Sequence, residues 1–254
     1  MEKWKLCKQV RELTMSGCKL ASSSGLASFS MLADFLSTFF ACAESLSALN
    51  LDYYRSDARL LIPTPPPLTW LKLRLSSCNL ADLKSLVSRS HKTLQTLSIS
   101  VFSDCLTSKD LASVLTDLVS IRELCIELYL PSDSFTFING GAEAIFDGCA
   151  QTLERLSICS EKATPMPPTV ATLLCASPFR TTLKRLDVTA MNLDTYEWAQ
   201  MLAQRRLPQL KTISSTSFSK RRRGRTEEQL IQRDLIWSIC EREGIEIIPH
   251  ETYE

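Results

Sequence analysis

The chain is poor in the residues on which most enzyme sites depend. Its 254 residues include seven glycines and two histidines, His91 and His250. A nucleophilic triad or a histidine-based zinc site needs a histidine beside a matching motif, and neither histidine has one. Gly-x-Gly-x-x-Gly, Walker and Gly-x-Ser-x-Gly motifs are also missing. We therefore expect no enzyme, no catalytic residue and no cofactor.

Neither sign of charge is in excess. The chain has 29 Lys and Arg against 28 Asp and Glu, a net charge of +1 at pH 7. A general nucleic-acid-binding protein usually carries a basic surplus, so this balance argues against one. A hydrophobic content of 44% argues against a disordered chain. A chain of this length can bury a core that needs no disulfide.

Long hydrophobic runs are missing as well. The most apolar segment, residues 30–46, contains Asp34 and Glu44 and is short for a membrane span, so we predict a buried helix there. The charged residues 1–9 are not followed by the apolar stretch of a signal peptide. We expect no membrane partner and a cytoplasmic or nuclear location.

The ten cysteines contain no Cys-x-x-Cys pair, and the sequence therefore predicts no metal site. They stand inside apolar patterns, as reduced cysteines do in the cores of cytosolic and nuclear proteins. We predict that all ten are free thiols in the core.

Leucine at regular spacing is what the sequence does have. Residues 10–20, VRELTMSGCKL, match the pattern L-x-x-L-x-L-x-x-[N/C]-x-L, and residues 70–80, WLKLRLSSCNL, match it again. Looser copies complete a series of repeats predicted to start at positions 10, 46, 70, 94, 121, 153, 183 and 210. A spacing of roughly 20–29 residues is typical of a repeat unit that contains one strand and one helix.

The repeats predict an α/β leucine-rich-repeat solenoid, a horseshoe formed by one domain over residues 1–254. Parallel strands would form its concave face, and helices and loops its convex face. Helices are predicted after the N-cap Thr107, with Asp110 three residues on, and over residues 194–205. A helix and a strand over residues 226–248 are predicted to cap the C-terminal end. Residues 1–9 are too few to form a cap. We therefore expect either that a preceding element has been lost or that another chain covers the N-terminal end.

Two segments outside the pattern leave alternatives open. Residues 63–66 spell P-x-x-P, which is either a stiff loop or a ligand of an SH3-type domain. Residues 220–225 form a basic run, which is a solvated insertion, a nuclear import signal or, less favoured because aromatic residues are not interleaved, a nucleic-acid contact. The run consists of Lys220, Arg221, Arg222, Arg223 and Arg225, with one glycine between.

The concave face is the expected place for a partner. Because strand side chains alternate, positions 2, 3, 5, 7 and 8 of each repeat are predicted to face it. Short hydroxyl side chains with scattered arginines dominate these positions, and Tyr and Arg are enriched among the anchors of protein interfaces. The candidate partner-binding residues are Tyr53, Arg74, Arg122, Arg155 and Arg185. The alternative is that such charges pair between neighbouring strands, for example Glu123 with Arg155.

The repeats, above all residues 10–20 and 70–80, resemble ribonuclease-inhibitor-like leucine-rich repeats. The irregular repeat lengths and the final segment CEREGIEII (240–248) are similar to the repeat part of fungal F-box proteins. This resemblance implies a substrate receptor of a cullin–RING ubiquitin ligase, in which repeats hold the substrate and an upstream F-box holds the adaptor. The chain contains no F-box motif, so we expect the receptor half of such a protein or a stand-alone relative.

Three functions follow as hypotheses. The first is a protein-binding module of the kind that receives ubiquitin-ligase substrates. The second is a stand-alone repeat regulator of an enzyme or GTPase, which the spread of repeat lengths disfavours. The third is a nuclear adaptor that uses the basic run 220–225. The partner expected on the concave face is a protein, and in the third hypothesis the basic run also contacts nucleic acid.

Overall fold

The computed structural model describes residues 7–16, 25–53, 63–75, 80–101, 106–128, 137, 140–160, 164–165, 169–188, 191–192, 195–215 and 227–249. The strands of its main sheet are β1 (Glu12–Ser16), β2 (Ala48–Tyr53), β3 (Trp70–Leu75), β4 (Thr96–Val101), β5 (Glu123–Leu128), β6 (Arg155–Ser160), β8 (Arg185–Asp187), β10 (Thr212–Ser215) and β11 (Glu246–Pro249). The helices are α1 (Gly25–Cys42), α2 (Leu80–Val87), α3 (Ser108–Leu115), α4 (Gly141–Gly148), α5 (Val170–Ala176), α6 (Thr195–Ala203) and α7 (Glu227–Glu243). Strands β7 (Thr164–Pro165) and β9 (Met191–Asn192) form a separate parallel pair.

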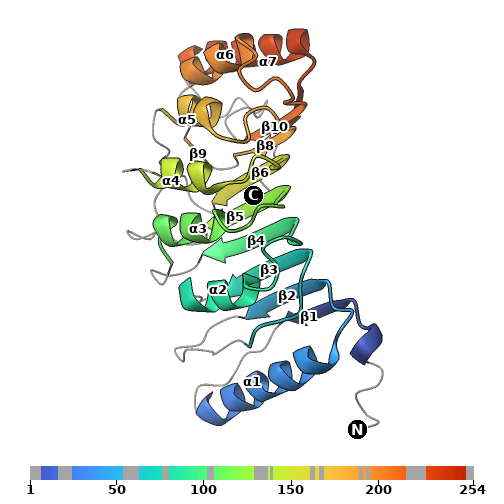
Figure 1. Cartoon of the computed structure of the whole chain (residues 1–254). Helices are drawn as coiled ribbons and strands as arrows, with labels where there is room; N and C mark the ends of the chain where they lie inside the picture. Colours follow the sequence, from blue (N-terminus) through green and yellow to red (C-terminus); the bar gives the residue numbers. More distant parts are fainter. Residues whose placement is uncertain are drawn as a thin grey trace.

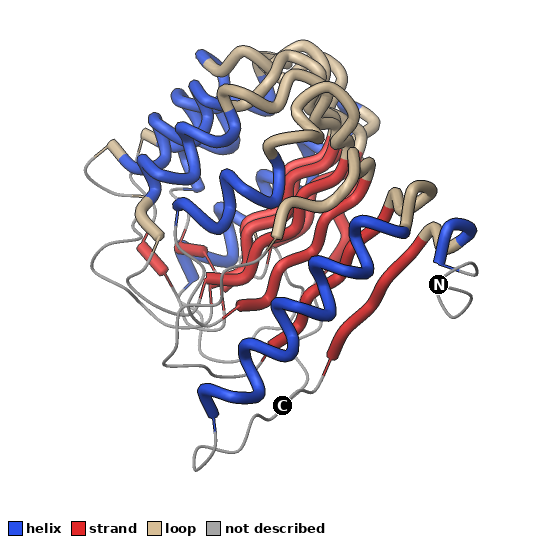
Figure 2. The backbone as a smooth tube through the Cα atoms, turned by 60° about the horizontal axis from the view of Figure 1, so that its bottom comes forward, coloured by secondary structure: helices blue, strands red, loops and turns tan. Residues whose placement is uncertain are grey.

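Within these residues, nine parallel strands lie in one sheet in chain order, β1-β2-β3-β4-β5-β6-β8-β10-β11. The helices that connect them follow one another along one side of the sheet (Figure 1). Figure 2 shows the same separation of strands and helices from a second direction. The predicted α/β class and parallel sheet are confirmed, and the chain is a repeat-like α/β solenoid. The horseshoe shape and the single domain over residues 1–254 stay predictions.

The core is built from rows of aliphatic side chains that run across the strands. Register pairing places equivalent residues of successive repeats side by side. From β2 to β10, each member of the central row is at most 1% exposed. Burying one such side chain contributes about 1.5–3 kcal/mol, and a repeat can bury its row only against its neighbours. The central row consists of Leu13, Leu49, Leu71, Leu97, Leu124, Leu156, Leu186 and Ile213.

The third repeat starts two residues earlier than predicted. Leu71 pairs with both Leu49 and Leu97, so the first residue of this repeat is the buried Leu68 and not Trp70. The error has a physical reason. Strand side chains have a period of two, and a shift of two residues leaves the leucines on the same face. The sequence therefore allows both registers.

The helix ends follow the predicted signals. At the start of α3, the Thr107 hydroxyl accepts a hydrogen bond from the Asp110 N–H (3.1 Å), and the Asp110 carboxylate accepts one from the Thr107 N–H (2.9 Å). The helix predicted over residues 194–205 is α6, and the predicted C-terminal helix and strand are α7 and β11. Gly244, with a φ of 69°, makes the turn between α7 and β11.

Helix α1 is longer and less buried than the sequence predicts. Leu36, Phe39 and Phe40 are buried, whereas Asp34 is exposed and Phe35 is 40% exposed. The segment is therefore a helix with one buried side, because it packs on the sheet in one direction only. Within the described residues, no helix is both long enough and apolar enough to cross a bilayer.

The cysteines depart in part from the core positions predicted for them. Seven lie in the described residues, and all seven are free thiols. Cys149 and Cys240 are buried in the core, and desolvation raises the pKa of Cys149 to about 12 and that of Cys240 to about 11. Cys125 and Cys159 are half-buried on the opposite face of the sheet, because they alternate with the core residues of β5 and β6. Cys18, Cys78 and Cys105 lie outside the described residues.

The P-x-x-P segment packs against the body of the protein. Pro65 and Pro66 are buried, and the Thr64 hydroxyl lies 3.1 Å from the Ser85 hydroxyl of α2, in a hydrogen bond. A ligand of an SH3-type domain needs accessible prolines, so the structure favours the stiff loop. The basic run 220–225 lies outside the described residues.

Candidate protein-binding face

The sheet has a second face, opposite the helices, which we call the open face. Its residues alternate with those of the core rows and form rows of their own. Most are polar, as the sequence predicts. The first row consists of Glu12, Ala48, Trp70, Thr96, Glu123, Arg155, Arg185 and Thr212, and the second of Thr14, Asn50, Lys72, Ser98, Cys125, Ser157, Asp187 and Ser214.

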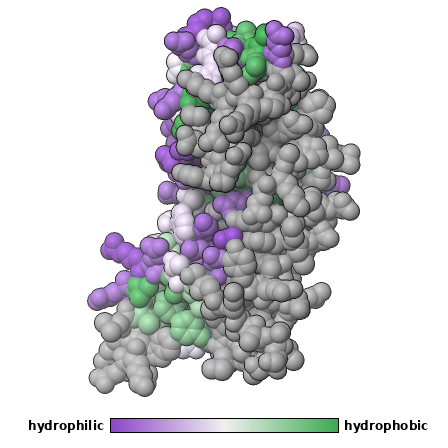
Figure 3. Space-filling model, turned by 180° about the vertical axis from the view of Figure 1, so that it is seen from behind, coloured by the Kyte–Doolittle hydropathy of each residue, from purple (hydrophilic) through white to green (hydrophobic). Residues whose placement is uncertain are grey.

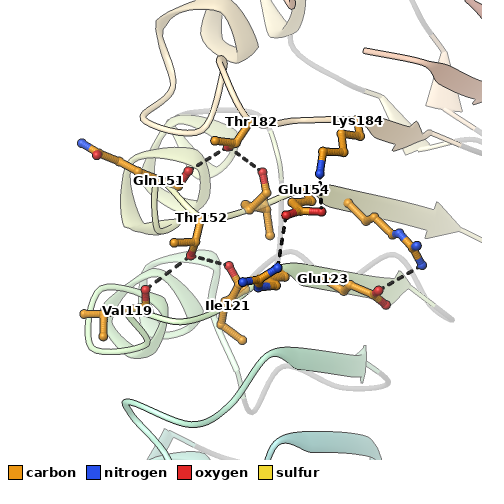
Figure 4. Close-up of polar contacts among 11 residues, drawn as sticks. Val119, Ile121, Glu123, Gln151, Thr152, Glu154, Thr182 and Lys184 are labelled. Atoms are coloured by element: carbon orange, nitrogen blue, oxygen red, sulfur yellow. Dashed lines mark hydrogen bonds and ion pairs between the residues drawn. The ribbon is translucent and has the colours of Figure 1, made fainter. Parts of the chain in front are cut away.

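Charged side chains at the starts of β5, β6 and β8 pair across strands. Arg155 lies 3.0 Å from Glu123, which is the pair that the sequence offered as the alternative to partner binding. The Glu154 carboxylate accepts hydrogen bonds from Arg122 (3.4 Å) and from Lys184 (2.8 Å), as Figure 4 shows. The bond from Lys184 lowers the pKa of Glu154 below its usual value. Such exposed pairs contribute little stability, but they order the side chains.

Threonine side chains fix the turns from which these charges project. The hydroxyls of Thr93, Thr152 and Thr182 donate to the carbonyls of Leu68 (2.7 Å), Ile121 (2.7 Å) and Leu153 (2.8 Å). Each acceptor is the first residue of the preceding repeat, so the bonds join consecutive repeats (Figure 4). The signal was present in the sequence as a Thr-Leu pair at three of the predicted starts, 93–94, 152–153 and 182–183.

A second group of candidate side chains lies on β2 and β3. Trp70, Lys72 and Arg74 alternate with the buried Leu71 and Leu73, so the three are on the open face. Trp70 is half-buried, and its register partners are the small residues of the same row, Ala48 and Thr96. The sequence analysis missed Trp70 because the shifted register assigned it to the core.

Beside this group, Arg74 lies 4.0 Å from Asp52 of β2. Buried side-chain oxygens of Asn50 and Asp52 accept no hydrogen bond within the described residues. Buried oxygens of this kind are usually satisfied by protein, water or a ligand.

The predicted site residues fall into two groups. Arg155 and Arg185 are direct neighbours on β6 and β8, and Arg122 lies just before β5, 60% exposed. Arg74 lies on β3, with β4 between it and β5. Tyr53 is the last residue of β2, and its role in partner binding stays a prediction. The Tyr53 side chain itself lies outside the described part.

The described residues hold no group of three or more His, Cys, Asp or Glu side chains placed to bind a metal ion. His91 lies exposed in the turn between α2 and β4. Burial raises the pKa of Cys125 and brings that of Cys159 to about 11, so both stay protonated near neutral pH. A protonated thiol is a poor nucleophile and a poor metal ligand. The open face can bind through charge, hydrogen bonds and Trp70.

No protein-family model and no curated protein matches the chain. Among solved structures, it is similar to a protein of Bacteroides fragilis whose crystal structure was determined in a structural-genomics programme. The similarity has a TM-score of 0.51, covers 98% of this chain and 68% of the other, and comes with 13% sequence identity. At that identity the comparison shows the fold alone, a repeat-like α/β solenoid.

Proposed function

We propose that this protein is a protein-binding repeat module that holds its partner on the open face of the sheet. The observation that carries the proposal is the position of Trp70. It is a half-buried tryptophan on a sheet face made mainly of short polar side chains, with small neighbours on both sides. Tryptophan is strongly enriched among the residues that dominate binding energy, and its ring stays reachable when its neighbours are short.

The surroundings of Trp70 suit a protein partner. Lys72 and Arg74 follow Trp70 on the open face of β3, and Asp52 lies opposite Arg74, so charged side chains of both signs lie on the same two strands as the ring. An aromatic centre with a polar rim is the usual anatomy of a protein interface. The protonated thiols of Cys125 and Cys159 favour binding over catalysis.

We further propose that the repeats are leucine-rich repeats of the ribonuclease-inhibitor-like type. This proposal is supported by the leucine rows, which stack in register from β1 to β10. Within that type, we propose the substrate-receiving part of an F-box ubiquitin-ligase receptor. This rests on the irregular repeat lengths and on residues 240–248, which form the end of α7 and the start of β11. If it holds, the partner is ubiquitylated in cells, and its level rises when this protein is depleted. If the turnover of the partner is unchanged when this protein is depleted, the receptor role is excluded.

Replacing Trp70 tests the binding role itself. Wild type, Trp70→Ala and Tyr196→Ala would each be incubated with cell lysate, and captured proteins quantified by mass spectrometry. Tyr196 is the matched control because it is an exposed aromatic residue, 69% exposed, on the helix side. We expect a partner whose capture falls at least tenfold in Trp70→Ala and stays unchanged in Tyr196→Ala, with direct binding confirmed by calorimetry. If Trp70→Ala keeps the wild-type melting temperature and captures the same proteins, the open face is not the binding site.

A further inference from the structure

Two arginines face each other on the open face where β6 meets β8. Arg155 and Arg185 are register partners on these adjacent strands, so their backbones are about 4.8 Å apart. Arg155 is 58% exposed, and Arg185 is exposed as well. Like charges directly opposite each other in a sheet repel and destabilise the pair. An anion bound between them would relieve that repulsion.

Two lysines extend this cationic surface. Lys184 precedes Arg185 in the chain, and the exposed Lys211 precedes Thr212, the register partner of Arg185 on β10. The backbone N–H of Lys211 donates to the Lys184 carbonyl (2.8 Å), so the two lysines are neighbours. Four cations thus project from the starts of three consecutive strands. We call Arg155, Lys184, Arg185 and Lys211 the cationic corner.

Acidic side chains of the protein compensate half of the cationic corner. Glu123 pairs with Arg155, and Glu154 pairs with Lys184. Within the described residues, Arg185 and Lys211 form no ion pair. Glu123 bonds to one terminal nitrogen of Arg155, and a guanidinium carries five N–H donors, so this arginine can bind a second acceptor. The corner therefore has two uncompensated cations and spare donors.

We propose that the cationic corner binds an acidic segment of the protein partner, with an Asp or Glu carboxylate between Arg185 and its neighbours Arg155 and Lys211. This inference rests on the proposed function, because the segment belongs to the partner that Trp70 anchors. Arg–carboxylate bonds are short and frequently bidentate, which gives them strength and direction. Complementary charge of this kind sets the register of a complex and speeds its formation.

A nucleic acid fits the corner less well. Four acidic residues lie around it and would repel a continuous phosphate backbone. They are Glu123 on β5, Glu154 just before β6, Asp187 on β8 and Glu246 on β11. Among the described open-face residues of β5 to β10, no aromatic side chain is present on which bases could stack. A peptide avoids both difficulties, because its carboxylates are on flexible side chains, of which one or two can enter the corner while the others turn towards solvent, and because it needs no base stacking.

The distance between the two contacts defines the segment further. Trp70 and Arg185 lie in the same row with four strand spacings between them, about 19 Å at about 4.8 Å each. An extended peptide advances about 3.3 Å per residue. The acidic residue of the partner should therefore lie about six residues from the one that packs on Trp70.

Charge reversal at the corner provides the test. Fluorescence anisotropy would measure binding of a labelled twelve-residue oligoglutamate, with oligoglutamine and a twelve-nucleotide single-stranded DNA of mixed sequence for comparison. The variant is Arg185→Glu with Lys211→Glu, and the control is Lys84→Glu with Lys109→Glu. The control residues are exposed on α2 and α3, so both variants change the net charge equally. Arg185→Ala with Lys211→Ala serves as a milder second variant, and all melting temperatures are compared.

We expect oligoglutamate to bind more tightly than oligoglutamine, and the corner variant to weaken its binding at least tenfold while the control changes it less than twofold. Trp70→Ala should leave oligoglutamate binding unchanged. Equal losses in the corner and control variants, or no binding of oligoglutamate by wild type, would overturn the proposal, as would tighter, corner-dependent binding of the DNA. If partner capture needs Trp70 but not the corner, the proposed function stands and this inference fails.

Discussion

In β1, the core-facing side chains of Leu13 and Met15 are half-buried, whereas their counterparts in β5, Leu124 and Ile126, are at most 1% exposed. The two strands follow the same residue pattern, so the pattern does not cause the difference. Strand β5 lies between β4 and β6, but β1 is at the end of the sheet order and has β2 on one side. Burial in this molecule is thus set by how many neighbours a repeat has.

The helix side shows the same contrast. Helices α3 and α4 lie so close that a Cβ atom on Gly148 would come within 2.7 Å of the Ala112 carbonyl oxygen. Around α1 and β1, by contrast, Phe35 is exposed, and Val10, Leu13 and Met15 are partly exposed hydrophobic residues. Figure 3 shows a hydrophobic patch at this end of the molecule. The middle is closely packed, and the N-terminal end is less so.

Shortening matched leucines measures this contrast most directly. Leu124→Ala should lower the free energy of unfolding by about 2–5 kcal/mol, because it opens a cavity that is enclosed on all sides. Leu13→Ala should lower the free energy of unfolding by about 1 kcal/mol, because the half-buried Leu13 side chain removes less apolar surface from water on folding than Leu124 does. Urea denaturation followed by circular dichroism gives both values. Equal losses of unfolding free energy in the two variants would mean that Leu13 of β1 is enclosed to the same extent as Leu124 of β5.

Adding one methyl group to Gly148 probes the contact between α3 and α4. We expect Gly148→Ala to destabilise the protein by about 1–3 kcal/mol, because the clash is with backbone that a side-chain rotation cannot relieve. Ser37→Ala, at an exposed position of α1, is the control and should stay within about 0.5 kcal/mol of wild type. A neutral Gly148→Ala would show that the two helices can move apart freely.

The smallest expected effect concerns the charge pairs of the middle strands. Lys184 lowers the pKa of Glu154, so the pair adds stability above the pKa of an unfolded glutamate, about 4.3, and this contribution is lost as pH falls through the lower folded value. Lys184→Ala should raise the pKa of Glu154 towards normal and flatten stability against pH below about 5. An NMR titration reads the Glu154 carboxyl directly, with Lys92→Ala as control. An unchanged titration would mean that Arg122 alone holds the carboxylate ionised.

The sequence could predict the class of fold because the leucine spacing reports the repeat directly. It could not predict the register at Trp70, since a period of two permits both alternatives and neighbouring strands decide between them. The capping box of α3 was predictable because its residues are three apart in the chain.

The candidate site was predictable in part for the same reason. Arg122, Arg155 and Arg185 lie near one another because repeat positions become rows. Trp70 was missed because the shifted register assigned it to the core. Whether a cation of the cationic corner is paired with an acidic side chain depends on the residue opposite it on the neighbouring strand. The sequence of a single repeat does not contain that information.

The alternation of core and open-face rows has an evolutionary consequence. Residues 70, 72 and 74 lie on the open face, while residues 71 and 73 are buried in the core between the sheet and its helices. Substitutions at the first set carry a smaller penalty to folding than substitutions of the leucines, because these side chains lie outside the buried core. Selection for partner recognition and selection for folding therefore act on different residue positions of the same strand. A lineage carrying this scaffold can acquire a new partner within a few substitutions and keep its architecture throughout.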